Sequence, residues 1–381
     1  MSWEMTIIGD HCTVTSSKRF HLSERSNSGV PFYCSKEIIQ KNRGEEITDC
    51  DYISEELYLN IAEKFGVPQE NDLLVTTRGT IGIPYLYRRN DRFYFADGNL
   101  TWIKDFKETL LPHFLYYWFR THEGQKKIDA IAKGTAQKAV PIAGIKTLEI
   151  SLPPVDVQRQ IADILTTYDS LIENNRKQIK LLEEAAQRLY KEWFVDLRFP
   201  GHETTPVVDG LPDGWHNAVV TDLLEINYGK DHKALEDGPI PVYGSGGLMR
   251  KVNKILHSGE CVLIPRKGSL NNIILVNGDF WTIDTMFFGV PRQPNVAKYV
   301  YLFLLGVDMY AMNIGAAVPS MTVKILDGMK ILCPAPEILE QFENMVRPFF
   351  SMIEMLKKKS KFLADARDLL LPKLMNGEIE V

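Results

Sequence analysis

The chain has 381 residues, of which 45% are hydrophobic and 24% charged, as in a soluble globular protein with enough chain for two cores. The five cysteines form no CxxC pair, so we expect no zinc or other metal site and no disulfide framework, and the absence of a signal-peptide pattern or a bilayer-length apolar run predicts a cytoplasmic protein. The net charge of −5 argues against a free-standing, non-specific DNA binder, but it allows a DNA reader whose basic residues gather on one face.

The sequence repeats itself at an offset of about 180 residues. Five pairs of matching segments carry the repeat: SWEMTIIGD (2–10) and GWHNAVVTD (214–222), GVPFY (29–33) and PIPVY (239–243), DLLVTTRGTIG (72–82) and ECVLIPRKGSLN (260–271), KGTAQKAVP (133–141) and IGAAVPS (314–320), and ISLPPVDVQRQIADIL (150–165) and ILCPAPEILEQFENMV (331–346). Each half therefore predicts one domain followed by one long helix. Two similar but non-identical domains, called heads below, would then be related by a pseudo-two-fold axis. Such an arrangement suits a target with pseudo-two-fold symmetry, of which duplex DNA is the commonest.

The repeat divides the chain into a first head (1–155), a central helix (156–198), a second head (199–335) and a C-terminal helix (336–381). Short β-branched or aromatic runs alternate with turn residues and helical stretches in both heads, which predicts mixed α/β heads and an α+β fold class overall. Predicted strands include VPFY (30–33), DLLVTT (72–77), TLEISL (147–152), IPVY (240–243), ECVLIP (260–265), NIILV (272–276), FWTI (280–283) and MKILC (329–333), and predicted helical stretches are 106–132 and 296–313. The Pro-, Gly- and Thr-rich segment 198–215 is expected to link the halves.

Both long helices carry apolar positions in alternating steps of four and three, a spacing typical of a coiled-coil seam. The seam positions of the first helix are Ile161, Leu165, Tyr168, Ile172, Asn175, Ile179, Leu182, Ala186, Leu189 and Trp193. Those of the second are Phe342, Val346, Phe349, Ile353, Leu356, Ser360, Leu363, Arg367, Leu370 and Leu374. We expect the helices to pack antiparallel, with a head at each end of a rod of roughly 50 Å. A coiled coil that only dimerises the protein is the alternative.

Three residues interrupt the regularity of these helices. Asn175 lies on the seam, where a buried polar residue fixes the register of a coiled coil, although a frayed or solvent-facing position would explain it as well. Pro348 should kink the second helix or move its start toward residue 349. Pro372 should end or bend its last turn.

Loops at equivalent places in the two heads combine a basic residue, a glycine and small hydroxyl or amide side chains after a strand. Such loops bring backbone N–H groups and cations close to phosphates or base edges. The candidate DNA contacts, chosen by position, are Ser35, Lys36, Arg78, Thr80, Lys133, Gln137, Lys138, Ser245, Arg250, Lys251, Arg266, Lys267, Ser269 and Asn271. Arg78 and Arg266 come first, for phosphate or guanine contact, and Lys138 and Lys251 next, for phosphates. Each loop alone reads as an ordinary solvated turn, so only their recurrence favours a nucleic-acid face.

The sequence lacks the P-loop, GxGxxG, NPPY-type, HExxH and GxSxG motifs, and these absences favour a binding protein over an enzyme. Asp97 and Asp284 are equivalent across the repeat, in FYFADGN and FWTIDTM. We interpret them as turn-forming or backbone-capping residues. The competing interpretation is a nuclease or transferase with an unfamiliar site around this pair. His113 and His122 flank a predicted helix and are expected to be surface or core residues.

Five segments resemble those of one known family, the DNA-specificity (S) subunits of type I restriction–modification systems. They are LPPVDVQRQIADILTTYDSLIENNRKQIKLLEEAAQRLYKEWFVD (152–196), LPDGW (211–215), YGSGG (243–247), ECVLIPRKGS (260–269) and RDLLLPKLMNGEIEV (367–381). The resemblance covers essentially the whole chain. The first half departs from the pattern because YCSKE (33–37) replaces the glycine loop, so we expect the heads to differ in loop structure.

The resemblance implies a subunit without a catalytic site. Each head would be a target-recognition domain that reads one half of a split, asymmetric site in double-stranded DNA. The helices would set the gap and dock two modification subunits, which methylate adenine, and restriction subunits would join them. S-adenosylmethionine, ATP and Mg would then bind the partner subunits, and no cofactor is expected in this chain. A coiled-coil scaffold whose heads bind proteins is the rival interpretation.

Overall fold

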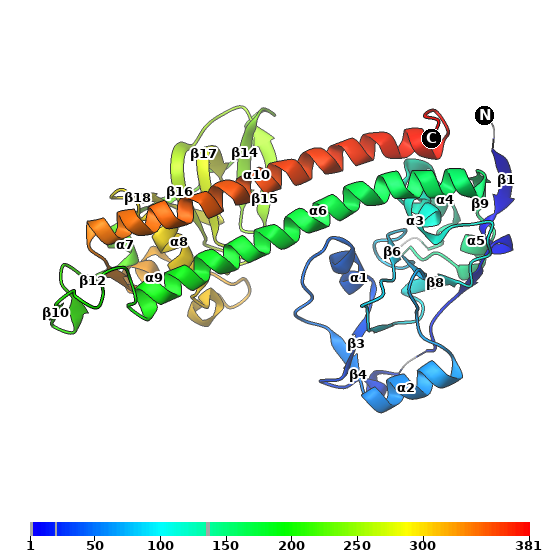
Figure 1. Ribbon diagram of the computed structural model, residues 1–381, viewed down its shortest axis with the longest axis horizontal. Coiled ribbons are helices and arrows are strands. Elements are labelled where there is room, and N and C mark those ends of the chain that lie inside the picture. Colours follow the sequence, from blue (N-terminus) through cyan, green and yellow to red (C-terminus); the bar gives the residue numbers. More distant parts are fainter. Residues whose placement is uncertain (1–2, 20, 135–137) are drawn as a thin grey trace. The chain divides into compact units, whose positions relative to one another are not determined.

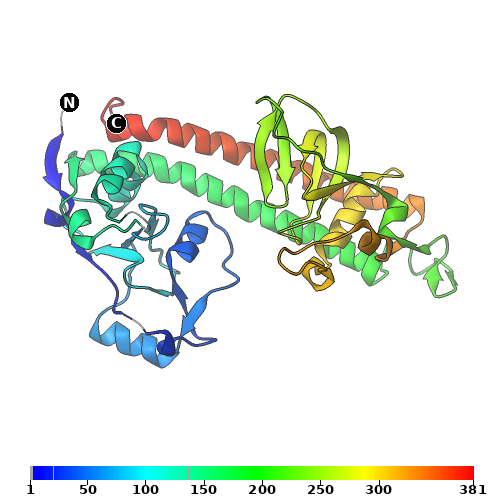
Figure 2. The ribbon, with the colours of Figure 1, turned by 180° about the vertical axis from the view of Figure 1, so that it is seen from behind.

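The computed structural model describes residues 3–19, 21–134 and 138–381 and divides into two compact units. Unit 1 contains residues 1–175 and 358–381, and unit 2 contains residues 176–357. Two long helices, α6 (Val155–Tyr190) and α10 (Pro336–Met375), contribute to both units. The two termini lie in unit 1 (Figure 1, Figure 2). No helix in the described ranges is long and apolar enough to cross a membrane.

The first head forms two small sheets and a strand pair. Its strands are β1 (Glu4–Ile7), β2 (Thr13–Thr15), β3 (Val30–Tyr33), β4 (Asp51–Ile53), β5 (Leu73–Thr76), β6 (Pro84–Leu86), β7 (Tyr94–Phe95), β8 (Leu100–Lys104) and β9 (Glu149–Leu152). Its helices are α1 (Ser35–Asn42), α2 (Glu55–Lys64), α3 (Pro112–Arg120), α4 (His122–Ile131) and α5 (Ile142–Lys146). The strand orders are β2-β8-β5-β6 and β4-β3-β7, and β1 pairs with β9 directly before α6.

The second head is built on one larger sheet of order β13-β18-β16-β17-β14-β15. Its strands are β10 (Val207–Val208), β11 (Leu211–Pro212), β12 (His216–Val219), β13 (Leu224–Tyr228), β14 (Ile240–Gly244), β15 (Gly247–Val252), β16 (His257–Pro265), β17 (Ile274–Thr282), β18 (Met286–Pro291) and β19 (Lys330–Cys333). Its helices are α7 (Val220–Leu223), α8 (Ala297–Leu305) and α9 (Val323–Asp327). The strands predicted separately at NIILV and FWTI are one strand, β17, whose partner β16 is equally long.

The internal repeat is present in the structure, and the α+β prediction is confirmed. Helix α5 recurs as α9, and β9 recurs as β19, each 181 residues later, and α10 likewise begins 181 residues after α6. The parallel pair β3–β7 corresponds to β14–β17, and β1–β9 corresponds to β12–β19. The heads differ where the sequences differ, because α1 follows β3 in the first head whereas the hairpin strand β15 follows β14 in the second.

The predicted helical stretch 106–132 is two helices that meet at Thr121. The Thr121 hydroxyl accepts a hydrogen bond from the Gly124 N–H at 3.0 Å and so caps α4, which satisfies one of the amides left open at a helix start. A Cβ at Gly124 would lie 2.3 Å from the Trp118 carbonyl oxygen, so only glycine permits this tight turn. Residues Phe114 and Trp118 of α3 pack into the core of unit 1.

In each unit the two long helices pack antiparallel through their seams. In unit 1, Ile161 and Leu165 of α6 share one core with Leu371 and Leu374 of α10. In unit 2, the rings of Trp193, just after α6, and Phe342 of α10 have centroids 5.6 Å apart. All twenty seam positions lie in the described residues, and none of them is exposed.

The prediction that Pro348 moves the helix start to residue 349 is wrong, and Pro372 does not end the helix. Helix α10 begins at Pro336, where a missing N–H costs nothing, and continues to Met375. A proline at position 348 leaves the Asn344 carbonyl without its usual helical donor, and both residues are exposed. The exposed placement of Pro348 makes the missing bond tolerable.

Candidate nucleic-acid interface

In the first head, the loop after β5 is held against the segment that follows α4. The Val140 N–H donates to the Thr77 carbonyl at 2.9 Å, and Arg78 forms an isolated β-bridge with Ala139. Ala139 in turn exchanges hydrogen bonds of 2.8 and 2.9 Å with Lys133. Two of the predicted loops therefore meet, with Arg78 and Lys133 on neighbouring backbone segments.

The third predicted segment of the first head joins them through Asn99. Its carbonyl accepts a hydrogen bond from the Ser35 hydroxyl at 3.1 Å and another from the Thr77 N–H at 2.8 Å. The exposed candidates in these segments are Lys36, Arg78, Thr80, Lys133 and Lys138. Lys138 lies 3.7 Å from the Asp129 carboxylate, and Gln137 lies outside the described residues. The described candidates thus form one polar, cation-bearing surface.

The second head repeats this construction around Gly268. The Gly268 N–H donates to Pro319 at 2.9 Å, the Met321 N–H donates to Arg266 at 2.8 Å, and Lys267 forms a β-bridge with Ser320. The glycine loop joins from the other side, because the Asn272 side-chain amide donates to the Ser245 carbonyl at 2.8 Å. Lys267 and Ser269 are exposed at this meeting point.

The pairing pattern shows which residues of the two loops are equivalent. The backbone N–H groups of Thr77 and Arg266 each donate a hydrogen bond of 2.8 Å to a carbonyl in the turn before β8 or β18, respectively. The carbonyls of the same two residues each accept a hydrogen bond from the polar segment that comes later in their own head. Arg78 therefore corresponds to Lys267, and each precedes a glycine of left-handed conformation, with φ of 76° at Gly79 and 86° at Gly268. By position in the sequence, Arg78 and Arg266 rank first as candidate contacts, whereas the backbone pairing makes Lys267 the counterpart of Arg78.

Two candidate arginines of the second head are engaged within the protein. The Arg266 guanidinium donates to the Asp284 carbonyl at 3.2 Å and lies 5.3 Å from the centre of the Tyr228 ring. Arg250 donates to the Asp237 carboxylate at 2.9 Å. Both are only half-exposed, whereas Lys251, Lys267, Ser269 and Asn271 are exposed, although the Asn271 side-chain oxygen accepts from the Met309 N–H at 2.9 Å. The exposed lysines are therefore better placed to reach a phosphate.

Asp97 and Asp284 both lie in turns, as the sequence predicts. Asp97 is half-buried in the turn between β7 and β8, and Asp284 is exposed in the turn between β17 and β18. No cluster of three His, Cys, Asp or Glu side chains in the described ranges is arranged to hold a metal ion.

The sequence did not point to the ionic contacts that attach each head to the long helices. In unit 1, Asp169 on α6 accepts hydrogen bonds from the Tyr117 hydroxyl at 2.8 Å and from Arg120 at 3.0 Å, and it also pairs with Arg367 on α10. Burial, and next the charge of Asp169, raises the pKa of Tyr117, so the phenol stays protonated and donates. Among these residues, Arg367 was the one that the sequence could have singled out, because it is the single charged residue among the twenty seam positions.

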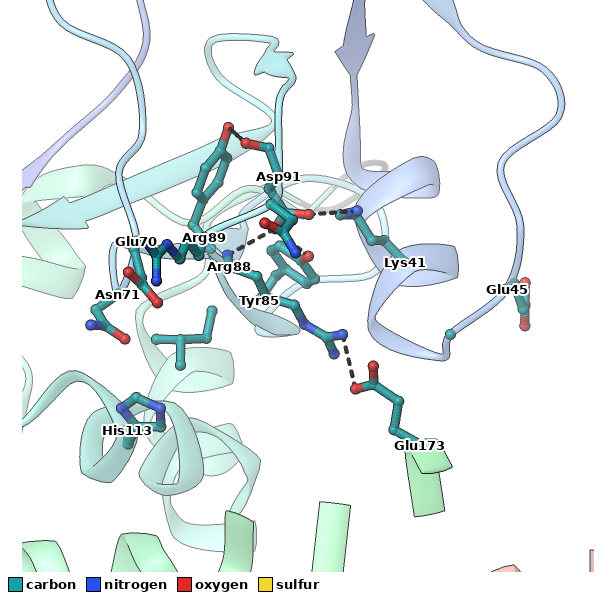
Figure 3. Close-up of a pocket in the computed structure, with 14 residues that line it drawn as sticks. Lys41, Glu45, Glu70, Asn71, Tyr85, Arg88, Arg89, Asp91, His113 and Glu173 are labelled. Carbon is teal, nitrogen blue, oxygen red and sulfur yellow. Dashed lines mark hydrogen bonds and ion pairs between the residues drawn. The ribbon is translucent and has the colours of Figure 1, made fainter. Parts of the chain in front are cut away.

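Figure 3 shows a second contact of this kind beside a cavity of about 580 Å³. Arg88, from the loop after β6, reaches Glu173 on α6 at 2.9 Å. Asp91 holds this loop, because its carboxylate accepts from the Tyr85 hydroxyl at 2.6 Å and pairs with Lys41 at 2.8 Å. The first head therefore contacts the long helices through two separate sets of charges.

Comparison with known proteins shows which family the chain resembles. Residues 1–184 match the model of the type I restriction modification DNA specificity domain. The type I restriction enzyme MjaIX specificity subunit of Methanocaldococcus jannaschii is 27% identical over 306 residues, 72% of this chain and 71% of the relative. The MjaVIII specificity subunit of the same organism is 23% identical, and the alignment covers 100% of this chain and 93% of the relative. Residues 1–184 therefore belong to this domain family, and the whole chain is similar to type I specificity subunits.

The fold of the family extends along the whole chain. The crystal structure of the type I S subunit from M. genitalium superimposes with a TM-score of 0.60 at 17% identity, covering 98% of this chain and 96% of that one. This likeness shows that the chain has the fold of a type I S subunit along its whole length.

Proposed function

We propose that this chain is the DNA-specificity subunit of a type I restriction–modification complex, with heads at 1–155 and 199–335 that each read one half of a bipartite, asymmetric site. The observation that carries this proposal is the shared construction of the two loop clusters. In each, an exposed cation, Arg78 or Lys267, precedes a left-handed glycine and is paired through its backbone with a second segment. Exposed cations held in this way suit phosphates and base edges.

The differences between the heads favour an asymmetric site. The first cluster includes the start of α1 with Ser35 and Lys36, whereas the second includes the β14–β15 hairpin with Ser245. Side chains carried by a helix and by a hairpin present different donors and acceptors to a groove. Each head would therefore recognise its own base sequence.

Helices α6 and α10 would set the gap between the half-sites and dock two modification subunits. A second apolar stripe on α10 supports docking, because Met345, Met352, Met355, Phe362 and Leu369 are between 42% and 72% exposed and follow heptad steps. Exposed apolar stripes of this length mark contact with another protein. Methylation of adenine, with S-adenosylmethionine, and ATP-driven restriction would belong to the partner subunits.

The test is methylation-sensitive sequencing of DNA from cells that produce this chain with its modification subunits. We expect adenine methylation at one split motif, which disappears when the gene for this chain is deleted. If the complex assembles and no split motif is methylated, the scaffold interpretation is correct. If the isolated chain cleaves or modifies DNA and loses this activity in Asp97→Ala and Asp284→Ala, the enzyme interpretation is correct.

A further inference from the structure

A buried ionic cluster attaches the second head to α10. Lys298, on α8, is 7% exposed, and Glu343, on α10, is 5% exposed. The Lys298 ammonium lies 2.8 Å from the Glu343 carboxylate and 2.5 Å from the carboxylate of Glu260 on β16. Arg347 donates to the same oxygen of Glu343 at 3.2 Å. One lysine thus bridges the sheet of the head and the helix beneath it.

This cluster borders a cavity of about 710 Å³ between β17, α8 and α10. On the other side of α8, Tyr299 and Val300 pack in the apolar core with Phe342 and Val346. Apolar packing is non-directional and allows small sliding movements, whereas charge-assisted hydrogen bonds fix direction and distance. The ionic cluster is therefore the contact on the cavity side that defines one orientation of the head.

The same place in the first head holds the cavity of Figure 3. His113 is the second residue of α3, as Lys298 is of α8, and Glu173 and Glu354 line the two cavities 181 residues apart. There the head reaches its helix through Arg88 and Glu173, whose side chains are 57% and 36% exposed. Both heads therefore meet a long helix through charges beside a cavity, but the pair beside the second cavity is buried whereas the pair beside the first is exposed.

We propose that Lys298 is a positioning residue that fixes the orientation of the second head on α10 and, through it, the length of the gap between the two half-sites. This inference rests on the proposed function. Adjacent base pairs are about 3.4 Å apart, so a head that moves by this distance over the DNA reads a site with a different gap. A buried ion pair is well suited to the task, because its best-established use in proteins is to select one register among alternatives.

The experiment uses the complete complex, with this chain and its modification subunits, and methylation-sensitive sequencing of host DNA. The wild-type complex first defines the split motif and its gap. The test variant is Lys298→Met with Glu343→Gln, which removes both charges together and so avoids leaving either one buried alone. Glu260→Gln is a milder second variant, Lys298→Arg is the conservative one, and Lys357→Met is the matched control. The Lys357 ammonium also pairs with a glutamate, Glu183, at 3.7 Å, but its side chain is 62% exposed.

We expect the double variant to methylate the same half-sites at gaps one base pair longer or shorter, at least about tenfold above the wild-type level. Glu260→Gln should relax the gap less, and Lys298→Arg and Lys357→Met should keep the wild-type gap. An unchanged gap in both the double variant and Glu260→Gln, in assembled complexes, overturns the inference. If the complex with the double variant methylates no DNA, the gap in the motif that the Glu260→Gln complex methylates decides whether the inference holds. A wild-type complex without a split motif would instead refute the proposed function.

Discussion

Asn175 on α6 donates a hydrogen bond from its side-chain nitrogen to the hydroxyl of Ser360 on α10, at 3.1 Å. Both residues are seam positions, and Asn175 is 2% exposed, so it is not a solvent-facing residue. The repeat does not relate these two residues, because the counterpart of Asn175 is Leu356. Antiparallel packing brings the two uncharged polar seam positions together, and their hydrogen bond is satisfied only in this register.

This relationship predicts that the pair tolerates loss of both members better than loss of one. Asn175→Ala should lower the free energy of unfolding by about 1–3 kcal/mol, because it removes the partner of Ser360 and leaves space on the seam. Asn175→Leu combined with Ser360→Leu should recover most of this loss. Thermal unfolding checks both variants. Asn174→Ala, at the exposed neighbouring position, should stay within about 0.5 kcal/mol, and an equal loss there would contradict the assignment.

Loss of either exposed cation should weaken DNA binding in a salt-dependent way. Arg78→Ala and Lys267→Ala should each reduce the slope of log affinity against log salt by about 1, as expected for one lost phosphate contact. Equilibrium binding to the methylated motif at several salt concentrations measures the slope. Arg188→Ala, with an 83% exposed side chain on α6, is the control and should leave the slope unchanged. Identical slopes for all three variants would remove these two residues from the interface.

The two loop glycines should differ in their tolerance of alanine. Both have positive φ, so each substitution strains the backbone by about 1 kcal/mol. A Cβ at Gly268 would also lie 2.9 Å from the Ser245 hydroxyl oxygen, whereas a Cβ at Gly79 meets nothing within 4 Å. Gly268→Ala should therefore push the Ser245 hydroxyl aside and reduce methylation more than Gly79→Ala. Equal methylation rates in the two variants would show that the hairpin contact does not matter for reading.

The stability of the protein should fall between neutral and mildly acidic pH because of His113. Burial lowers the pKa of His113 below its ordinary value of 6.5, with only partial compensation from Asp163 and Glu70. The unfolded chain therefore binds the proton more readily, so this contribution to stability is complete above pH 6.5 and is lost as the pH falls toward the folded pKa. His113→Asn should flatten the dependence of the melting temperature on pH below 6.5. If the curves of melting temperature against pH are parallel for the wild type and the variant, His113 is not the source of the pH dependence.

Lengthening both long helices by one heptad should lengthen the gap and keep both half-sites. Insertions after Asn175 and after Lys357, where the two units meet in the sequence, preserve the heptad phase of each seam. Seven residues add about 10 Å of helix, or roughly three base pairs. Sequencing of the methylated motif measures the gap. Changed half-sites would mean that the helices do not act as a ruler.

The sequence alone determined the features that depend on neighbours along the chain. A coiled-coil seam shows in the sequence as apolar residues spaced three and four apart, and a repeated domain shows as two similar segments. Both can therefore be predicted without knowledge of the fold. The loops with Arg78 and Lys267 were readable for the same reason, as conspicuous residues directly after predicted strands. The residue-level equivalence of Arg78 and Lys267 came from the structure, because matching letters cannot locate the backbone pairing that fixes equivalence.

Only the tertiary structure decided which charges meet. Lys298 and Glu343 are 45 residues apart in the chain, and Asp169 and Arg367 are 198 residues apart. In the sequence each reads as an ordinary charge, because ionic contacts need no spacing rule and depend on where distant segments come together. The same reason explains Arg250 and Arg266, which look like DNA contacts by position but are half-buried against Asp237 and Tyr228. Periodicity is a local property of the chain, whereas the pairing of charges is set by the packing of remote elements.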